Sequence, residues 1–223
     1  MKTKLLIKQA LGTLFFFILL FVCAGRFLYW QGWVYVLIGL VMMVLSYTIL
    51  KIDDDLMIER SKPQEGTKKW DKFLLLLSFF VTLGMVAVAG LDSGRFHWSP
   101  EFHRGAYALG ILFTITGQLL FLVAQKQNKF FSSTVRIQTE RGHVVCDTGL
   151  YKIVRHPAYL GSVIQLAGFP LLFGSLWSLV PAGVSVIITG IRTYLEDKTL
   201  QQELAGYPEY AGKTRYKLIP FIW

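Results

Sequence analysis

The sequence predicts an all-α membrane protein, and three observations support this fold class. Hydrophobic residues make up 53% of the 223 positions, only 17% are charged, and the mean hydropathy is +0.47, whereas an ordinary soluble domain carries about 25% charged residues. Several apolar runs are long enough to cross a bilayer. Basic residues also alternate between successive loops, as in polytopic membrane proteins. These features predict a bundle of about six transmembrane helices, the last two forming a hairpin.

Four apolar runs predict the first four spans. Each supplies the roughly 18 to 20 residues that a helix needs to cross the hydrocarbon layer, and they occupy residues 5–24, 33–50, 73–91 and 106–124. The stretch 157–191 is also apolar, with Gly174 and Ser175 at its middle, so we expect two helices joined by a turn there. As helix it would rise only about 52 Å. The hairpin is therefore expected to be short and to start and end at one interface.

The distribution of Lys and Arg predicts the orientation of the bundle. With six spans, 20 of the 23 basic residues fall at the two termini and in the loops 51–72 and 125–156. Because positive charge is retained in short cytoplasmic loops, both termini are expected in the cytoplasm. The formal charge of +9 then reflects topology and an attraction to anionic membrane lipids, so no nucleic-acid partner is expected.

The first apolar run also has features of a cleaved signal peptide, because Lys2 and Lys4 precede it. The run exceeds the roughly 7 to 15 residue core of such peptides, and no clean small-x-small cleavage site follows, so we interpret it as a span. Cys23 falls in this span and Cys146 in a predicted cytoplasmic loop, which argues against a disulfide. Without repeats, linkers or a second soluble domain, function must reside in the loops or the polar interior.

Two loops contain residue types that bind metals in other proteins. The loop 51–72 mixes six basic residues with the acids Asp53, Asp54, Asp55, Glu59 and Asp71. Adjacent carboxylates suit Mg²⁺, but Met57 stands where an Asp-Asp-x-x-Asp pattern needs its last acid, so we interpret these acids as solvated and helix-capping. His97 and His103 have no third ligand in view and are interpreted as surface residues. No metal site is expected.

The loop 125–156 is over thirty residues long, and loops of this length are usually functional or disordered. Its mixture of β-branched and aromatic residues argues against disorder. We therefore expect a partly extended, structured loop.

The residues that end this loop predict a helix start. Pro157 suits the first position of a helix, where its missing N–H costs nothing, and it biases His156 toward an extended conformation. The start presents backbone N–H groups and partial positive charge, with Arg155 alongside, and such an end binds anions. An ordinary membrane helix with an interfacial arginine has the same residues.

A second charged cluster follows the hairpin. Arg192 and Glu196 lie four residues apart, so they share one helix face, with Asp197 one position round. A surface ion pair accounts for this spacing. The two carboxylates can also accept ribose hydroxyls or face a cation, helped by the aromatic faces of Tyr151, Tyr159, Tyr207 and Tyr210.

Together, the two clusters resemble a known family. The segment 147–161 resembles the Gly-x-Tyr-x-x-Val-Arg-His-Pro-x-Tyr-x-Gly signature of the isoprenylcysteine carboxyl methyltransferase family. Arg192, the pair Glu196-Asp197 and the segment 206–220 are similar to its Arg, paired-acid, Tyr-x-x-Tyr and Leu-x-Pro elements. Two departures are Asp197, where Glu is usual, and Leu150, where the family has Pro. The joint occurrence is more specific than either motif alone.

The resemblance covers about residues 105–223 and implies transfer of a methyl group from S-adenosylmethionine. The acceptor is expected to be an isoprenoid or lipid-like molecule, a carboxylate among the candidates, that enters from the bilayer. Arg192 and Glu196 would be catalytic. The cofactor-binding residues would be Tyr151, Val154, Arg155, His156, Pro157, Tyr159, Gly161, Asp197 and Tyr207.

The resemblance also predicts the organisation and location of the protein. Residues 1–104 would form an N-terminal scaffold of three spans on the lipid or substrate side, and residues 105–223 the methyltransferase-like region with its cofactor pocket. We expect a multi-pass protein of a bacterial inner membrane with a cytoplasmic active site.

Two other functions remain open. Sterol-reductase-like membrane enzymes use a nicotinamide cofactor and have a related C-terminal architecture, but their Lys-Tyr-Gly-x-x-Trp stretch and cysteine element are missing around Gly206. A non-enzymatic membrane subunit or small transporter would use polar residues at membrane depth, such as Gln118, Gln165 and Arg192. Few such residues are ionisable, and the polarity gathers at one edge instead.

Overall fold

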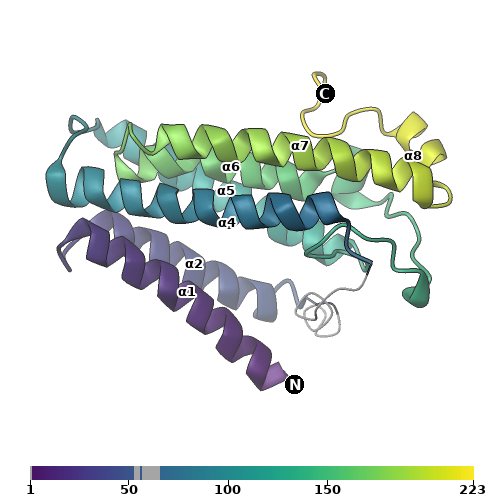
Figure 1. Cartoon of the computed structure of the whole chain (residues 1–223), viewed down its shortest axis with the longest axis horizontal. Coiled ribbons are helices and arrows are strands. Elements are labelled where there is room, and N and C mark those ends of the chain that lie inside the picture. Colours follow the sequence, from purple (N-terminus) through teal and green to yellow (C-terminus); the bar gives the residue numbers. More distant parts are fainter. Residues whose placement is uncertain (1, 53–55, 57–65) are drawn as a thin grey trace.

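The computed structural model describes residues 2–52, 56 and 66–223, and over these residues it is a helical bundle without strands (Figure 1). The all-α fold class is therefore confirmed. The long helices are α1 (Lys2–Ala24), α2 (Trp30–Thr48), α4 (Lys69–Ala89), α5 (Arg104–Gln127), α6 (Pro157–Phe173) and α7 (Leu179–Glu203). The short elements are the π-helix η1 (Gly90–Phe96), the 3₁₀-helices η2 (Thr139–Arg141) and η3 (Gly149–Lys152), and α8 (Tyr207–Lys213).

Four helices of the described chain have the length and hydropathy of a membrane span: α2, α4 continued by η1, α5 and α7. Two shorter apolar helices, Ala10–Ala24 and Pro157–Phe173, accompany them. Four clear spans and two shorter helices thus stand where six spans were predicted. The number and apolar character of these helices indicate a multi-pass membrane protein.

The hairpin of α6 and α7 turns where the sequence predicted, at Gly174, whose φ of 63° suits a residue without a side chain. The hairpin begins and ends at the same end of the bundle, as expected (Figure 1). Beyond Ile191, α7 carries the charged cluster on one helix, as the spacing of Arg192 and Glu196 predicted. It continues to Glu203 and spans 25 residues, which is about 37 Å of helix. Leu200 and Leu204 explain the extension, since both pack into an apolar cluster with Tyr151 and other residues at that end. The second charged cluster therefore lies on the last turns of α7.

Glycines hold α5 and α6 at backbone contact. A Cβ on Gly117 would lie 2.4 Å from the carbonyl oxygen of Gly161, and a Cβ on Gly161 would lie 2.5 Å from that of Gly117. Seven residues, or about two helical turns, further along, a Cβ on Gly168 would lie 2.8 Å from the carbonyl oxygen of Gly110. Small residues permit such close approach between membrane helices, where packing rather than the hydrophobic effect drives association.

A buried carboxylate fastens one end of the bundle. Asp92, on η1, accepts hydrogen bonds from the Ser99 N–H (2.7 Å), the Ser99 hydroxyl (2.6 Å) and the Ser175 hydroxyl in the α6–α7 turn (2.6 Å). Its side chain is fully buried, so these donors replace the water it has lost. The contact joins the far end of α4 to the hairpin turn.

The opposite end of the bundle collects the chemistry-bearing segments. The start of α4, the ends of α5 and α7, the start of α6, α8 and the loop 128–148 all meet there (Figure 1). The loop contains η2 but no strand. It is structured by side-chain hydrogen bonds, because the buried Gln138 donates to the carbonyl of Phe130 (2.7 Å) and accepts from Arg141 (2.6 Å).

Gly117→Ala should destabilise the bundle, because its methyl group would press on the backbone of α6. Overpacking of this kind costs about 1 to 3 kcal/mol. We expect a lower thermal midpoint for the purified protein in detergent, measured by tryptophan fluorescence. Gly84→Ala is the matched control, since no atom beyond the neighbouring backbone of α4 lies within 4 Å of the added Cβ. Equal midpoints for both variants would contradict this account of the α5–α6 contact.

Candidate functional site

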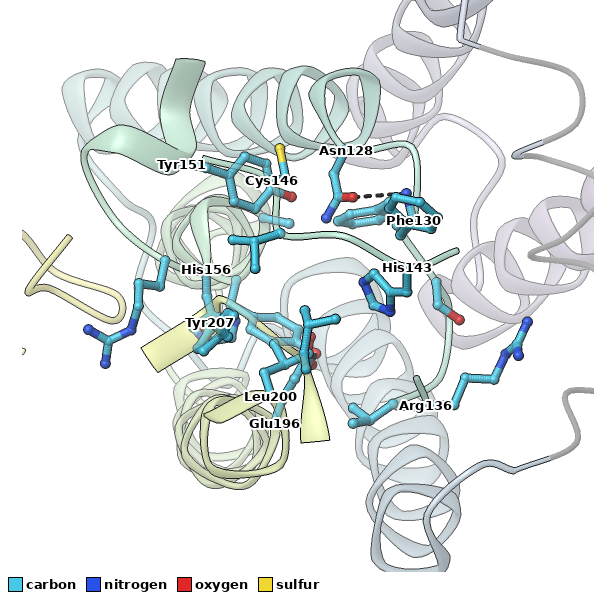
Figure 2. A pocket seen from close by; sticks show the side chains of 18 of the residues that line it. Asn128, Phe130, Arg136, His143, Cys146, Tyr151, His156, Glu196, Leu200 and Tyr207 are labelled. Atoms are coloured by element: carbon cyan, nitrogen blue, oxygen red, sulfur yellow. Dashed lines mark hydrogen bonds between the residues drawn. The ribbon is translucent and has the colours of Figure 1, made fainter. Parts of the chain in front are cut away.

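A cavity of about 330 Å³ opens among the segments that meet at this end (Figure 2). Its walls come from α5, the loop 128–148, η3, α6, α7 and α8, with Leu75 of α4 on one side. Small-molecule sites in proteins range from about 300 to 1,000 Å³ and are mostly apolar with a few convergent polar groups. The cavity has this size and composition, so it is the candidate site.

The structure brings the two charged clusters of the sequence together at this cavity. Seven of the predicted site residues line it: Tyr151, Arg155, His156, Tyr159, Arg192, Glu196 and Tyr207. The other four do not. Val154 and Pro157 are buried beside it, Gly161 faces α5, and Asp197 lies behind the wall.

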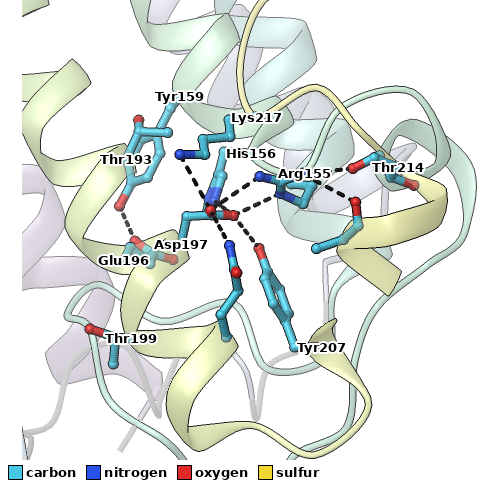
Figure 3. A network of polar contacts seen from close by, with 12 residues as sticks. Arg155, His156, Tyr159, Thr193, Glu196, Asp197, Thr199, Tyr207, Thr214 and Lys217 are labelled. Atoms are coloured by element: carbon cyan, nitrogen blue, oxygen red, sulfur yellow. Dashed lines mark hydrogen bonds and ion pairs between the residues drawn. The ribbon is translucent and has the colours of Figure 1, made fainter. Parts of the chain in front are cut away.

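Asp197 is the centre of a buried polar network (Figure 3). Arg155 donates to it in bidentate fashion, from Nε at 2.7 Å and Nη2 at 3.1 Å. The Tyr207 hydroxyl and the Gln201 amide donate at 3.0 and 2.8 Å, and Lys217 Nζ lies 3.6 Å away. Both carboxylate oxygens are thus satisfied by the protein itself, which favours a structural role for Asp197.

The remaining hydrogen-bond donors of Arg155 contact the C-terminal segment 214–217. Its Nη1 donates to the carbonyls of Thr214 (2.8 Å) and Arg215 (2.9 Å), and its backbone N–H donates to Tyr216 (2.9 Å). The His156 N–H similarly donates to the Lys217 carbonyl at 2.9 Å. These contacts favour a structural role for Arg155 over the direct binding of an anion that the sequence suggested.

His156 precedes α6 with φ −126° and ψ 63°, outside the helical region as expected before Pro157. Its ring stacks on Tyr159, with centroids 5.8 Å apart and planes 22° apart. Nε2 is buried 3.4 Å from Asp197 Oδ1 and has no hydrogen-bond partner among the described residues. This nitrogen thus faces the Asp197 carboxylate at ion-pair distance, and its residue lines the cavity.

Glu196 has different surroundings from its neighbour in the sequence. The Tyr159 hydroxyl donates to its Oε2 at 2.5 Å. Within the described part of the chain, no Lys or Arg lies within ion-pair distance of this carboxylate. Glu196 therefore brings negative charge to a cavity with aromatic walls, a combination that attracts cations.

Arg192 reaches a partner that the sequence analysis missed. Its Nε lies 2.7 Å from Asp71 Oδ1 and its Nη2 3.3 Å from Asp71 Oδ2, and Nη2 also donates to the Ser133 carbonyl at 2.9 Å. Asp71 is fully buried and also accepts the Val135 N–H at 2.7 Å. The interpretation of Asp71 as solvated is therefore wrong. Its position beside an apolar run was the available signal, because ionisable residues at membrane depth are usually paired.

The other acids of that loop, Asp53, Asp54, Asp55 and Glu59, lie outside the described residues. So does Met57, on which the argument against a magnesium motif rested.

The loop 128–148 adds an aromatic wall. The rings of Phe130 and His143 pack with centroids 4.6 Å apart, and the Arg141 guanidinium lies over Phe130 at 5.6 Å. Burial, together with the charges of Arg136 and Arg141, lowers the pKa of His143 from its ordinary 6.5 to about 4. His143 is therefore neutral at physiological pH.

Three tyrosines near the cavity keep their protons. Burial raises the pKa of Tyr151, Tyr207 and Tyr210 well above the ordinary value. Tyr210 accordingly donates to the Tyr151 carbonyl at 2.6 Å, and Tyr151 donates to the Ala124 carbonyl at 3.3 Å. These side chains serve as hydrogen-bond donors and aromatic walls rather than as bases.

Fold and site together define a class: a multi-pass helical membrane protein with a small-molecule pocket where its helices end. Residues 108–202 match the model of the isoprenylcysteine carboxyl methyltransferase family, so this region of the chain is similar to that family. The match contains both charged clusters, but neither Asp71 nor Tyr207.

Two relatives are similar to this chain. Protein-S-isoprenylcysteine O-methyltransferase of Saccharomyces cerevisiae is 32% identical over 122 residues, covering 51% of this chain and 48% of the yeast protein. Delta(14)-sterol reductase of Mus musculus is 24% identical over 220 residues, covering 86% of this chain and 52% of the mouse protein. The chain thus spans about half the length of each of these relatives.

Asp197→Asn should unfold the site end of the bundle. The variant leaves Arg155 buried without a counter-charge, and breaking a buried ion pair in this way costs about 3 to 5 kcal/mol. We expect a large fall in the thermal midpoint, with early proteolysis near residues 214–217. The exposed Asp147→Asn is the control and should resemble the wild type. A stable Asp197→Asn protein would disprove the structural role.

His143 should make stability depend on pH. Its pKa is about 4 in the folded protein and near the ordinary 6.5 when unfolded, so between these values only the unfolded state takes up the proton. Stability should therefore fall as pH drops from about 6.5 to 4. His143→Gln should reduce this dependence in thermal unfolding measured across that range. The exposed His97→Asn should retain it, and equal slopes for His143→Gln and wild type would refute the prediction.

Proposed function

We propose that the chain is an integral membrane methyltransferase that uses S-adenosylmethionine and acts on a lipophilic, isoprenoid or lipid-like acceptor. The observation that carries this proposal is the Glu196 carboxylate, which faces an aromatic cavity with no Lys or Arg of the described chain within ion-pair distance. The family match over residues 108–202 and the similarity to the yeast methyltransferase support it.

The residues around the cavity fit the chemistry of this cofactor. S-adenosylmethionine has a sulfonium and an ammonium, which suit Glu196 and the aromatic faces, and a nucleoside with hydrogen-bonding groups. Nε2 of His156 is a buried polar atom able to meet such a group. When bound, the cofactor supplies a methyl group activated by the positive sulfur.

The protein's own residues then bind, orient and exclude water. Tyr159 fixes the orientation of the Glu196 carboxylate through its hydroxyl. Apolar side chains, among them Leu75, Phe121 and Leu200, keep water from the cavity, which strengthens electrostatic interactions inside it. A carboxylate acceptor is already ionised at pH 7 and needs no general base. Positioning and desolvation therefore supply most of the catalysis.

Arg192 is proposed to orient an anionic acceptor. Its Nε and Nη2 are engaged by Asp71 and Ser133, and no described residue hydrogen-bonds its Nη1. Arg192 and Leu75 line the cavity from α7 and α4, two membrane-length helices that pack together. We propose that the acceptor enters from the bilayer beside them, and that residues 1–104 form the scaffold on that side.

The site is proposed to face the cytoplasm. Both ends of the chain lie at the same end of the bundle as the cavity (Figure 1). The basic loops 51–72 and 125–156 connect helices at this end as well. Positive charge marks the cytoplasmic side, and a bacterial inner membrane is the expected location.

A nicotinamide-dependent reductase is the second candidate. The similarity to the mouse sterol reductase extends over 86% of the chain and so includes the N-terminal helices. The sequence around Gly206 lacks the Lys-Tyr-Gly-x-x-Trp stretch of such reductases. Direct binding of each cofactor separates the two candidates.

Calorimetric titration of the purified protein should detect binding of S-adenosylmethionine and none of NADPH. Glu196→Gln should weaken that binding about tenfold or more, equivalent to about 1.4 kcal/mol, because the cavity loses its negative charge. Glu209→Gln, an exposed acid on α8, is the control and should bind as wild type does. Binding of NADPH alone would reject the methyltransferase in favour of the reductase.

A further inference from the structure

Arg192 and Glu196 lie one turn apart on α7, yet they do not pair. On an isolated helix, opposite charges at this spacing attract each other. Here Arg192 turns away to Asp71 on α4, and Glu196 receives the Tyr159 hydroxyl instead. The guanidinium stays close, since it lies 5.5 Å from the centroid of the Tyr159 ring.

The position of Asp71 is fixed by backbone contacts as well as by Arg192. The Val135 N–H donates to its Oδ2, and one turn earlier the Lys68 N–H donates to the Val135 carbonyl at 3.2 Å. Asp71 is fully buried, and the Arg192 side chain is only 17% exposed. The Ser133 carbonyl holds the same guanidinium from the loop. The start of α4 and the loop 128–148 thus together accept the hydrogen bonds of Arg192.

The two carboxylates therefore compete for one guanidinium. Asp71 offers bidentate, charge-assisted hydrogen bonds, which are the strongest kind available to arginine. Without the charge of Asp71, the guanidinium would still have the Glu196 carboxylate one turn away on the same helix, and attraction between the two is strengthened where water is scarce. Arg192 would then neutralise Glu196, and the cavity would lose the charge that faces a ligand cation.

We propose that Asp71 is a positioning residue of the cofactor site: it holds Arg192 against α4 and so keeps the Glu196 carboxylate available to the cation of the cofactor. This inference rests on the proposed function. It makes α4, which precedes the family-matched region, an indispensable part of the site.

The first test is calorimetric titration of purified full-length variants with S-adenosylmethionine. Asp71→Asn should bind about tenfold more weakly than wild type or worse, a loss of about 1.4 kcal/mol. The double variant Asp71→Asn/Arg192→Met should recover to within about threefold of wild type, because no cation remains to neutralise Glu196. A purely structural role for Asp71 predicts no recovery. A double variant that binds no better than Asp71→Asn would overturn the proposal.

Asp92→Asn is the matched control. Asp92 is an equally buried aspartate on the same transmembrane segment, hydrogen-bonded at the opposite end of the bundle. This variant should lose stability but keep the wild-type affinity for S-adenosylmethionine. If Asp71→Asn does not fold, the double variant alone decides, since it buries no unpaired charge of this pair. A folded double variant without binding contradicts the proposal.

A second test needs no cofactor and so separates this inference from the proposed function. Thermal midpoints of Arg192→Met, Glu196→Gln and their combination give the coupling between the two side chains. The coupling should be more strongly stabilising in the Asp71→Asn background than when Asp71 is present. Equal coupling in both backgrounds overturns the inference. Absence of S-adenosylmethionine binding by the wild type, with the predicted change in coupling, would reject only the proposed function.

Discussion

The buried ion pair of Arg155 and Asp197 is the interaction on which the rest of the site depends. It joins the start of α6 to the end of α7, and the remaining donors of Arg155 fasten the segment 214–217 across both helix ends. These segments lie far apart in the sequence, and this pair brings them together at one end of the bundle. Such an arrangement is costly to form, because both charges lose their water, and it is retained where geometry matters more than stability.

The adjacent acids Glu196 and Asp197 on α7 therefore have different roles. Asp197 turns toward α6 and α8 and is fully satisfied by protein donors, whereas Glu196, one position round, faces the cavity with a single hydroxyl as its partner. The shorter side chain of Asp197 suits the structural role, since its carboxylate lies inside a closed network. The longer side chain of Glu196 suits a carboxylate that faces the cavity. The departure of Asp197 from the glutamate usual in the family thus falls on the structural member of the pair.

The sequence was enough to predict what depends on local composition and what recurs in related proteins. Apolar runs predicted the helices, Gly174 predicted the turn and Pro157 predicted the start of α6. The family signature predicted that Arg155 and Glu196 lie at one site, and both line the cavity. What it missed depends on contacts across the chain. Asp71 and Arg192 are 121 residues apart, so no periodicity joins them, and a carboxylate near a basic loop reads as solvated. The end of α7 at Glu203 was not predicted, because the packing of Leu200 and Leu204 into an apolar cluster depends on tertiary contacts that composition does not reveal.

The backbone contact between α5 and α6 limits how the molecule can move. Where helices touch through glycines, their backbones are in direct contact, so one helix cannot slide along the other without a clash. At Gly117 and Gly161 the carbonyl oxygen of each helix lies against the α-carbon of the other. The wall of the cavity that these helices form is consequently fixed in shape. We therefore expect the entry and release of a ligand to depend on the opposite wall, where Phe130 and His143 lie on a loop whose only helix is the short η2. Substitutions in the loop 128–148 can therefore change which ligands the cavity accepts, whereas any side chain at Gly117 or Gly161 would clash with the opposite helix.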